Sequence, residues 1–179
     1  MAIEYRTEPD YIEYLDGEAH PKASPRAAHS EVAGRFAHLL YRLGADEHGK
    51  ILVEGDAVVR RLAGRRTKLI PDLSLMTWEQ LNALEGRERE YPPVAPAVAI
   101  EIWSPGDSET YLARKIERYL TEGSQLVLDV RIETRSITVH AASCVRTFAE
   151  GETLACDAVA WFTFPVRDVF SGLDRTGRR

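Results

Sequence analysis

The sequence predicts a mixed α/β domain built around one sheet, because two amphipathic helix patterns are interleaved with aliphatic, strand-like runs. The run at 96–103 is almost continuously apolar, which is typical of a strand buried on both faces. A helix pattern at 108–123 follows it directly, as in a strand–helix–strand unit. With 179 residues, we expect a single domain at 1–172 and a flexible tail at 173–179.

The first helix is expected over 24–44. Ser24 can cap its start, Pro25 suits the first helical position, and Gly44 suits the exit. The apolar residues of this segment fall within one arc of about 120°, so this face should pack on the sheet. His29 falls inside the same arc.

Strand-like runs are expected at 51–59 and 69–76, joined by a basic turn at 60–68. The charged segment at 78–90 favours a short, exposed helix or excursion.

The second helix, at 108–123, has Ser108 as its expected cap and Gly123 at its end. Two strands should follow at 125–132 and 135–141. A final hairpin and turn should then pack their aromatic residues on the core, namely Trp161, Phe162 and Phe164.

Composition excludes several classes of protein. Lys and Arg number 23 and Asp and Glu number 28, so the net charge is −5, and nucleic-acid binding would need a local basic patch. Cys144 and Cys156 are too few for a disulfide scaffold and lack metal-site spacing. The longest uncharged stretches have ten residues, too short to span a bilayer, and the acidic N-terminus does not resemble a signal peptide. We expect a cytoplasmic protein without membrane contact.

Two carboxylates occupy strand positions where burial disfavours charge. Glu101 lies within the apolar run, opposite a row of aliphatic side chains, and Asp72 follows a proline in the earlier run with leucines on the opposite face. An ionised carboxylate in such a strand must be paired, hydrogen-bonded or bound to a metal. We therefore predict that Asp72 and Glu101 lie on adjacent strands and share one site. The alternative interpretation is a turn aspartate and a structural glutamate paired with an arginine.

Lys115 lies on the apolar face of the second helix, between Tyr111 and Tyr119. A lysine there either extends past the tyrosines to solvent or meets a buried anion. Two inward carboxylates with a neighbouring lysine suit metal-assisted phosphodiester hydrolysis. Asp and Glu oxygens hold Mg²⁺ with several waters retained, the metal acidifies a water, and the lysine orients or deprotonates that water or stabilises charge developing on the phosphate.

Several segments, taken in order, resemble the Uma2 family. They are the opening segment YIEYLDGEAHPKASPRAAHSEV, the Pro-Asp pair at Asp72, AIEIWSP around Glu101, KIERYLTEG from Lys115, and the strand LVLDV. The similarity extends over nearly the whole expected domain. The family is assigned to the PD-(D/E)XK nuclease superfamily, so the resemblance implies a restriction-endonuclease-like core, a central mixed β-sheet flanked by helices, and a divalent metal, Mg²⁺ or Mn²⁺.

By this resemblance Asp72 and Glu101 would be metal ligands and Lys115 the catalytic lysine. The superfamily's usual lysine stands two residues beyond the glutamate, where this chain has Trp103. Catalysis would then depend on Lys115 reaching the site from the helix. The family's following strand often begins Tyr-Trp, whereas this chain reads Ser124-Gln125.

Two further residues are candidate auxiliaries. Glu13 belongs to the opening segment and could join the acidic cluster, with a solvated turn as the alternative. His29 could be a ligand or a satisfied core histidine. The basic turn could contact phosphates or be a solvated surface; its cations are Arg60, Arg61, Arg65, Arg66 and Lys68.

The sequence thus favours a Mg²⁺-dependent endodeoxyribonuclease with DNA as its partner. Such a small enzyme cutting both strands would act as a homodimer. The alternative is a catalytically silent protein of the same fold that binds a nucleic acid or a protein. The acidic net charge and Trp103 favour that alternative, whereas retention of Asp72, Glu101 and Lys115 favours the enzyme.

Overall fold

The computed structural model describes residues 11–22, 25–62, 64–89, 91–104 and 108–174. The expected helix cap Ser24 lies outside these residues, as does the part of the expected flexible tail beyond residue 174.

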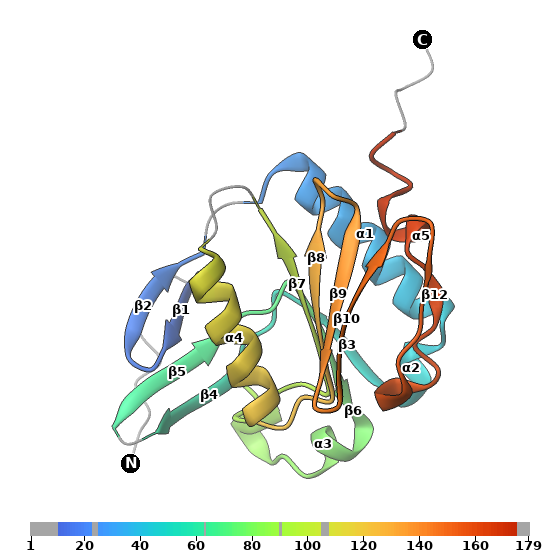
Figure 1. The fold of residues 1–179 in the computed structure, drawn as a ribbon. Coiled ribbons are helices and arrows are strands. Elements are labelled where there is room, and N and C mark those ends of the chain that lie inside the picture. The colour runs from blue at the N-terminus through green and yellow to red at the C-terminus, as the bar shows by residue number, and fades with distance from the viewer. Residues whose placement is uncertain (1–10, 23–24, 63, 90, 105–107, 175–179) are drawn as a thin grey trace.

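Six strands form a central sheet in the order β10-β9-β8-β7-β6-β3 (Figure 1). The pair β7 and β8 is parallel, and the other four neighbouring pairs are antiparallel. The sheet is therefore mixed, and helices cover both of its faces, as the sequence predicts. Its strands are β3 (Gly49–Val53), β6 (Leu73–Thr77), β7 (Val98–Trp103), β8 (Leu126–Arg131), β9 (Ser136–Ala141) and β10 (Cys144–Ala149).

A second, four-stranded sheet lies beside the long helix α4 (Glu109–Thr121), in the order β2-β1-β5-β4 (Figure 1). The sequence did not predict this sheet. Its first hairpin turns at Asp16 and Gly17, whose φ values of 55° and 90° are typical of an Asp-Gly type I′ turn. The strands are β1 (Ile12–Leu15), β2 (Glu18–Pro21), β4 (Ala57–Leu62) and β5 (Arg65–Leu69).

Two strand predictions were wrong. The run at 51–59 is divided between β3 and β4, which belong to different sheets, and the run at 69–76 is divided between β5 and β6. Glu54 has a φ of 50°, so the chain turns there and leaves the central sheet. Pro71 has no backbone N–H for a ladder bond, and it lies between β5 and β6. The expected basic turn at 60–68 is mostly the β4–β5 hairpin.

The two main helices follow their predicted faces. Helix α1 (Ala27–Arg42) buries His29 and its apolar stripe, and Gly44 follows it with a φ of 75°, as expected for an exit glycine. Helix α4 begins at Glu109 and is capped by Ser108, whose hydroxyl accepts a hydrogen bond from the Tyr111 N–H. The remaining elements are α2 (Ala45–His48), α3 (Trp78–Asn82), η1 (Gly86–Arg89), β11 (Thr153–Leu154), η2 (Asp157–Val159), β12 (Phe164–Pro165) and α5 (Arg167–Phe170).

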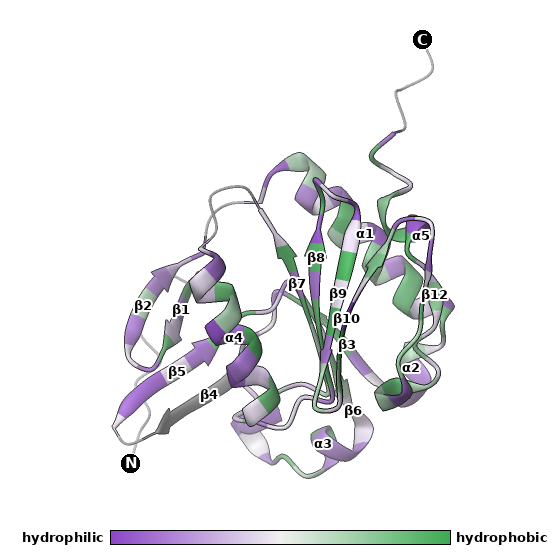
Figure 2. Cartoon of the chain, viewed as in Figure 1, coloured by the Kyte–Doolittle hydropathy of each residue, from purple (hydrophilic) through white to green (hydrophobic). Residues whose placement is uncertain are grey.

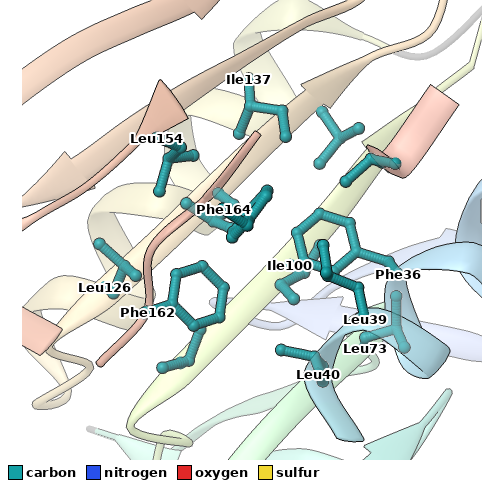
Figure 3. Packing of buried hydrophobic residues seen from close by; sticks show 14 of the residues in the cluster. Phe36, Leu39, Leu40, Leu73, Ile100, Leu126, Ile137, Leu154, Phe162 and Phe164 are labelled. Atoms are coloured by element: carbon teal, nitrogen blue, oxygen red, sulfur yellow. The ribbon is translucent and has the colours of Figure 1, made fainter. Parts of the chain in front are cut away.

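The main core lies between the central sheet and α1. Figure 3 shows Phe36 of α1 packed with Phe162, Phe164 and Ile100, and the rings of Phe36 and Phe164 meet edge to face with centroids 5.5 Å apart. On the opposite face of the sheet a smaller apolar cluster lies beneath α4. Figure 2 shows that the ribbon of α4 alternates between hydrophobic and hydrophilic residues, and the polar members of its buried face build the site described next.

Candidate active site

The three residues expected to carry chemistry come from three elements around one cavity. Glu101 is on β7, Asp72 lies directly before the neighbouring strand β6, and Lys115 is on α4. All three are buried, and all three line a cavity of about 540 Å³. The structure thus brings Asp72, Glu101 and Lys115 together.

Lys115 is held between two carboxylates. Its Nζ lies 2.7 Å from Oε2 of Glu101 and 2.8 Å from Oε1 of Glu13. The other oxygen of Glu101, Oε1, accepts a hydrogen bond of 2.8 Å from the Tyr119 hydroxyl. The Lys115 side chain does not extend to solvent, because it meets buried anions on the sheet and on the β1–β2 hairpin.

Glu13 comes from β1, not from a solvated turn. Its Oε1 accepts a hydrogen bond of 2.7 Å from the Ile70 N–H, and its Oε2 accepts one of 3.0 Å from the Tyr111 hydroxyl. Glu13 therefore connects the small sheet to both α4 and the segment that leads to Asp72. These contacts place it in the same acidic cluster as Glu101.

Asp72 has a separate set of partners. Its Oδ1 lies 2.7 Å from Nζ of Lys22, and its Oδ2 lies 3.3 Å from Nε2 of His29 and accepts a 2.6 Å hydrogen bond from the Ile102 N–H. Lys22 also donates to the Ile70 carbonyl at 2.8 Å. Both carboxylate oxygens of Asp72 therefore face positive or donor groups of the protein itself.

Burial and charge displace the pKa values of these groups in opposite directions. For Asp72, burial alone would raise the pKa, but the hydrogen bond from His29 and the charge of Lys22 outweigh it and hold the pKa below the ordinary value. The same hydrogen bond raises the pKa of His29. Burial raises the pKa of Glu101 to about 7, assisted by the negative charges of Asp72 and Glu13 and opposed by Lys115.

Lys115 keeps its proton despite its burial. Burial alone would lower its pKa, but the charges of Glu101 and Glu13 outweigh this and raise the pKa above the ordinary value. Burial also raises the pKa of the two neighbouring phenols, Tyr111 and Tyr119. Glu13 and Glu101 therefore share one ammonium, and ionisation of both would leave these three groups with excess negative charge.

Ion pairs on the solvent side of α4 attach the β1–β2 hairpin to the helix. Arg114 Nη1 donates to Glu18 at 2.6 Å, and Arg118 donates to Asp16 in the turn of the hairpin. The ring of His20 stacks on Tyr111 with centroids 3.9 Å apart. These contacts hold β1 against α4, and they thereby position Glu13 over the site.

The described basic side chains of the β4–β5 hairpin lie outside this cavity. Arg65, Arg66 and Lys68 do not line it, Lys68 is buried 3.3 Å from Asp56, and Arg66 lies over the Tyr14 ring. The side chains of Arg60 and Arg61 lie outside the described residues. Phosphate binding by this group stays a prediction.

Sequence reasoning missed Lys22 and gave Glu13 only an auxiliary role. Both residues could have been found from the Asp-Gly turn and the short alternating segments beside it, because this pattern indicates a β-hairpin. A hairpin at 12–21 would have made Glu13 a strand residue with one buried face. Its docking on α4 could not have been read from that pattern.

The donor set fits a hard divalent cation. Mg²⁺ binds oxygen ligands and commonly takes only one or two carboxylates while it retains waters, and Asp72 and Glu101 offer such oxygens toward one cavity. The raised pKa of Glu101 reflects burial and excess negative charge that a cation would relieve. Among the described residues, no group of three or more His, Cys, Asp or Glu side chains is arranged to hold a metal. Asp72 would have to exchange Lys22 or His29 for the ion, and Glu101 would have to exchange Lys115 or Tyr119.

The fold places the protein in a known structural class. It is similar to a crystal structure described as a putative nuclease belonging to DUF820 from Anabaena variabilis ATCC 29413, with a TM-score of 0.78 and 19% sequence identity over 94% of each chain. The chain therefore has a nuclease fold. A comparison with curated proteins finds no match.

The family follows from the sequence match. The Uma2 family model, described as a putative restriction endonuclease, matches residues 2–167. The chain belongs to the Uma2 family, which confirms the resemblance seen in the sequence.

Proposed function

We propose that this protein is an endonuclease that hydrolyses DNA phosphodiester bonds with the help of bound Mg²⁺ or Mn²⁺. The observation that carries the proposal is the convergence of Asp72, Glu101 and Lys115 on one cavity. Membership of the Uma2 family and the similarity to a protein described as a putative nuclease of DUF820 support the same reaction class.

In this proposal Asp72 and Glu101 hold the metal ion. Bound there, a divalent cation supplies an acidified water and shields the charge that develops on the phosphate. Glu101 has a pKa of about 7 in the metal-free protein, so a cation must compete with a proton there and binding should strengthen as pH rises.

Lys115 is the proposed catalytic lysine. Its proton is held by the two flanking carboxylates, so the ammonium suits stabilisation of negative charge on the phosphate better than abstraction of a proton from water. Glu13 and Tyr111 act as positioning residues, since Glu13 contacts Lys115 and Tyr111 orients Glu13.

Calorimetry with Mg²⁺ and Mn²⁺, followed by cleavage assays on single-stranded and double-stranded DNA, tests the proposal. The parental protein should bind the metal and cut DNA, and Asp72→Ala should abolish both. The matched control is Asp46→Ala, an exposed aspartate outside the cavity, which should change neither. No heat of binding at millimolar metal, or equal cutting by Asp72→Ala, contradicts the proposal.

A catalytically silent binding protein is the second candidate. It is favoured by the pairing of Asp72, whose two oxygens already face Lys22, His29 and the Ile102 N–H. Such a neutralised carboxylate can serve as a structural link without any metal. Absence of metal binding together with retained nucleic-acid or protein binding would support this candidate.

We propose a homodimer for cleavage of both strands, with one site for each strand, and a cytoplasmic location. Cys144 and Cys156 are free thiols, which fits a reducing compartment. None of the helices in the described ranges has the length and apolar character needed to cross a membrane. Sedimentation of the protein with and without DNA measures the oligomeric state.

A further inference from the structure

We propose, on the premise of the proposed function, that the substrate presents an unpaired nucleotide beside the bond to be cut. This nucleotide enters the cavity and lies against Trp103. The substrate class is thus a single strand, or a duplex with a locally unpaired nucleotide, and not a continuously paired duplex.

The acidic groups lie deep below the protein surface. Asp72 is 3% exposed and Glu101 is 5% exposed, and both reach the outside through the cavity of about 540 Å³. A cavity of this volume is in the usual range for a small ligand, so it can admit one nucleotide unit. A paired, stacked duplex cannot follow its phosphate into such a space. Enzymes that must bring a nucleotide of a duplex into a deep active-site pocket do so by taking it out of the base stack.

The wall of the cavity contains an aromatic side chain that can stack on a base. Trp103 is a half-buried indole in that wall, at the end of β7 and two residues from Glu101. The Arg131 guanidinium carbon lies 4.8 Å from the Trp103 ring centroid, and Arg131 is itself bonded to Asp129 and Glu109. Because these ion pairs fix the Arg131 side chain, its contact with the ring holds the Trp103 indole in place. Aromatic side chains in such positions stack on bases of any sequence.

Three side-chain nitrogens at the cavity have no hydrogen-bond partner among the described residues. Nε1 of Trp103, Nδ1 of His29 and Nε2 of His20 are buried and have no hydrogen-bond partner within the described part of the chain. Oε2 of Glu18 lies 3.7 Å from Nε2 of His20, beyond hydrogen-bond distance. All three residues line the cavity. Buried polar atoms are normally satisfied. The indole N–H donates, and an imidazole nitrogen donates or accepts according to its protonation, so a nucleotide, which carries both acceptors and donors, would complete this site.

One end of the cavity also suits the phosphate of a nucleotide. Arg26 lines it and stands at the N-cap of α1, a helix of 16 residues whose first N–H groups lack partners within the helix. A phosphate oxygen is the acceptor that both features attract. The cavity therefore combines an anion-binding end, an aromatic wall and the acidic pair.

Binding of three fluorescent oligonucleotides of one sequence tests the proposal. They are a single strand, its perfect duplex, and a duplex with one unpaired nucleotide, each titrated in Ca²⁺ and monitored by fluorescence anisotropy. We expect the single strand and the interrupted duplex to bind about tenfold more tightly than the perfect duplex. Equal affinity for all three, or no binding to any, overturns the proposal.

Variants of Trp103 test whether the preference for an unpaired nucleotide arises in the cavity. Trp103→Ala should lose about tenfold affinity for the single strand and little for the perfect duplex, while Trp103→Phe should keep most of it because a stacking ring remains. The matched control is Trp78→Ala, an indole 46% exposed and outside the cavity, which should bind like the parent. An unchanged Trp103→Ala overturns the proposal.

A measurement on the parental protein covers the case in which Trp103→Ala does not fold. A 2-aminopurine at the unpaired position should lose fluorescence when it stacks in the cavity, and no change on binding would overturn the proposal. Failure of the proposed function is distinguishable, because it appears as no cleavage of any of the three substrates in Mg²⁺ or Mn²⁺ while the binding preference persists.

Discussion

The two faces of the central sheet differ in what they bury, although the same strands form both. On the α1 face, β7 contributes Val98, Ile100 and Ile102 to a large apolar core. On the α4 face the same strand contributes Ala99 and Glu101, and α4 adds Lys115 among its apolar residues. Small and charged residues on this second face leave the space and the polarity that the cavity needs.

Stability and chemistry are therefore divided between the two faces of the central sheet. The apolar core removes large side chains from water at no electrostatic cost. The α4 face instead buries several ionisable groups whose mutual pairing only offsets their desolvation. A protein can sustain such a cluster because the opposite face supplies the stability.

The largest effect is expected for cleavage by Lys115→Met. Removing the ammonium should lower cleavage by about 10²-fold or more if Lys115 supports the reaction. It should also reduce stability, because Glu13 and Glu101 would face each other without their shared cation. The control is Leu39→Ala on the α1 face, which should lose stability but keep its activity per folded molecule. Parental cleavage by Lys115→Met would leave this lysine a purely structural role.

Phe36→Ala should be the most destabilising change on the apolar face. Its ring is fully buried and packs on Phe162 and Phe164, so we expect a loss of about 3–5 kcal/mol in the free energy of unfolding. No titratable group takes part in this packing, and the loss should be the same at pH 5 and pH 8. Denaturant unfolding measures both values, and a strong pH dependence of the loss would contradict the division between faces.

Glu101→Gln should remove a pH dependence of the free energy of unfolding that arises on the α4 face of the sheet. The folded protein holds the Glu101 proton up to about pH 7, whereas the unfolded chain releases it near the ordinary value of 4.5. Because the folded state binds more protons in this window, stability conferred by Glu101 falls as pH rises from about 4.5 to 7, by about 3 kcal/mol.

The measurement is denaturant unfolding in EDTA across that window. Glu101→Gln should flatten the decline, and exposed Glu47→Gln should leave it as in the parent. Asp72 acts in the opposite sense, since its lowered pKa adds stability that is lost only when pH falls below the ordinary carboxyl range. An unchanged slope in Glu101→Gln would show that this carboxyl group does not titrate in the window.

Lys22→Met should raise the affinity for Mg²⁺ or Mn²⁺ by about tenfold, because Lys22 contributes a positive charge 2.7 Å from a proposed ligand oxygen of Asp72. Calorimetry measures the dissociation constant. Lys50→Met removes an exposed lysine on β3 and should have no comparable effect. Weaker metal binding by Lys22→Met would mean that Lys22 supports the site instead of competing with the ion.

The smallest effect is expected from the β4–β5 hairpin. Changing Arg65 and Arg66 to Ala should weaken DNA binding and make the slope of log affinity against log salt shallower, by about one unit for each phosphate that the protein no longer neutralises. These side chains lie outside the cavity, so any preference for an unpaired nucleotide should persist. An unchanged affinity and salt slope would show that the hairpin is only a solvated surface.

Sequence analysis anticipated the two helices and the principal acidic positions for a simple reason. Helical and strand periodicities show which positions face inward, so a charged residue at such a position is visible as an exception. Glu101 in its apolar run and Lys115 on its apolar stripe are such exceptions. The strand predictions failed at Glu54 and Pro71, where a single turn moves the chain from one sheet to another.

The mixed fold and the inward placement of Asp72, Glu101 and Lys115 therefore follow from local patterns in the sequence. The partners of these side chains depend on how distant elements pack together. Glu13 and Tyr111 are 98 residues apart, yet they share a hydrogen bond because the β1–β2 hairpin docks on α4. Local periodicity carries no information about such docking, which depends on long-range ion pairs and packing between elements that are distant in the chain.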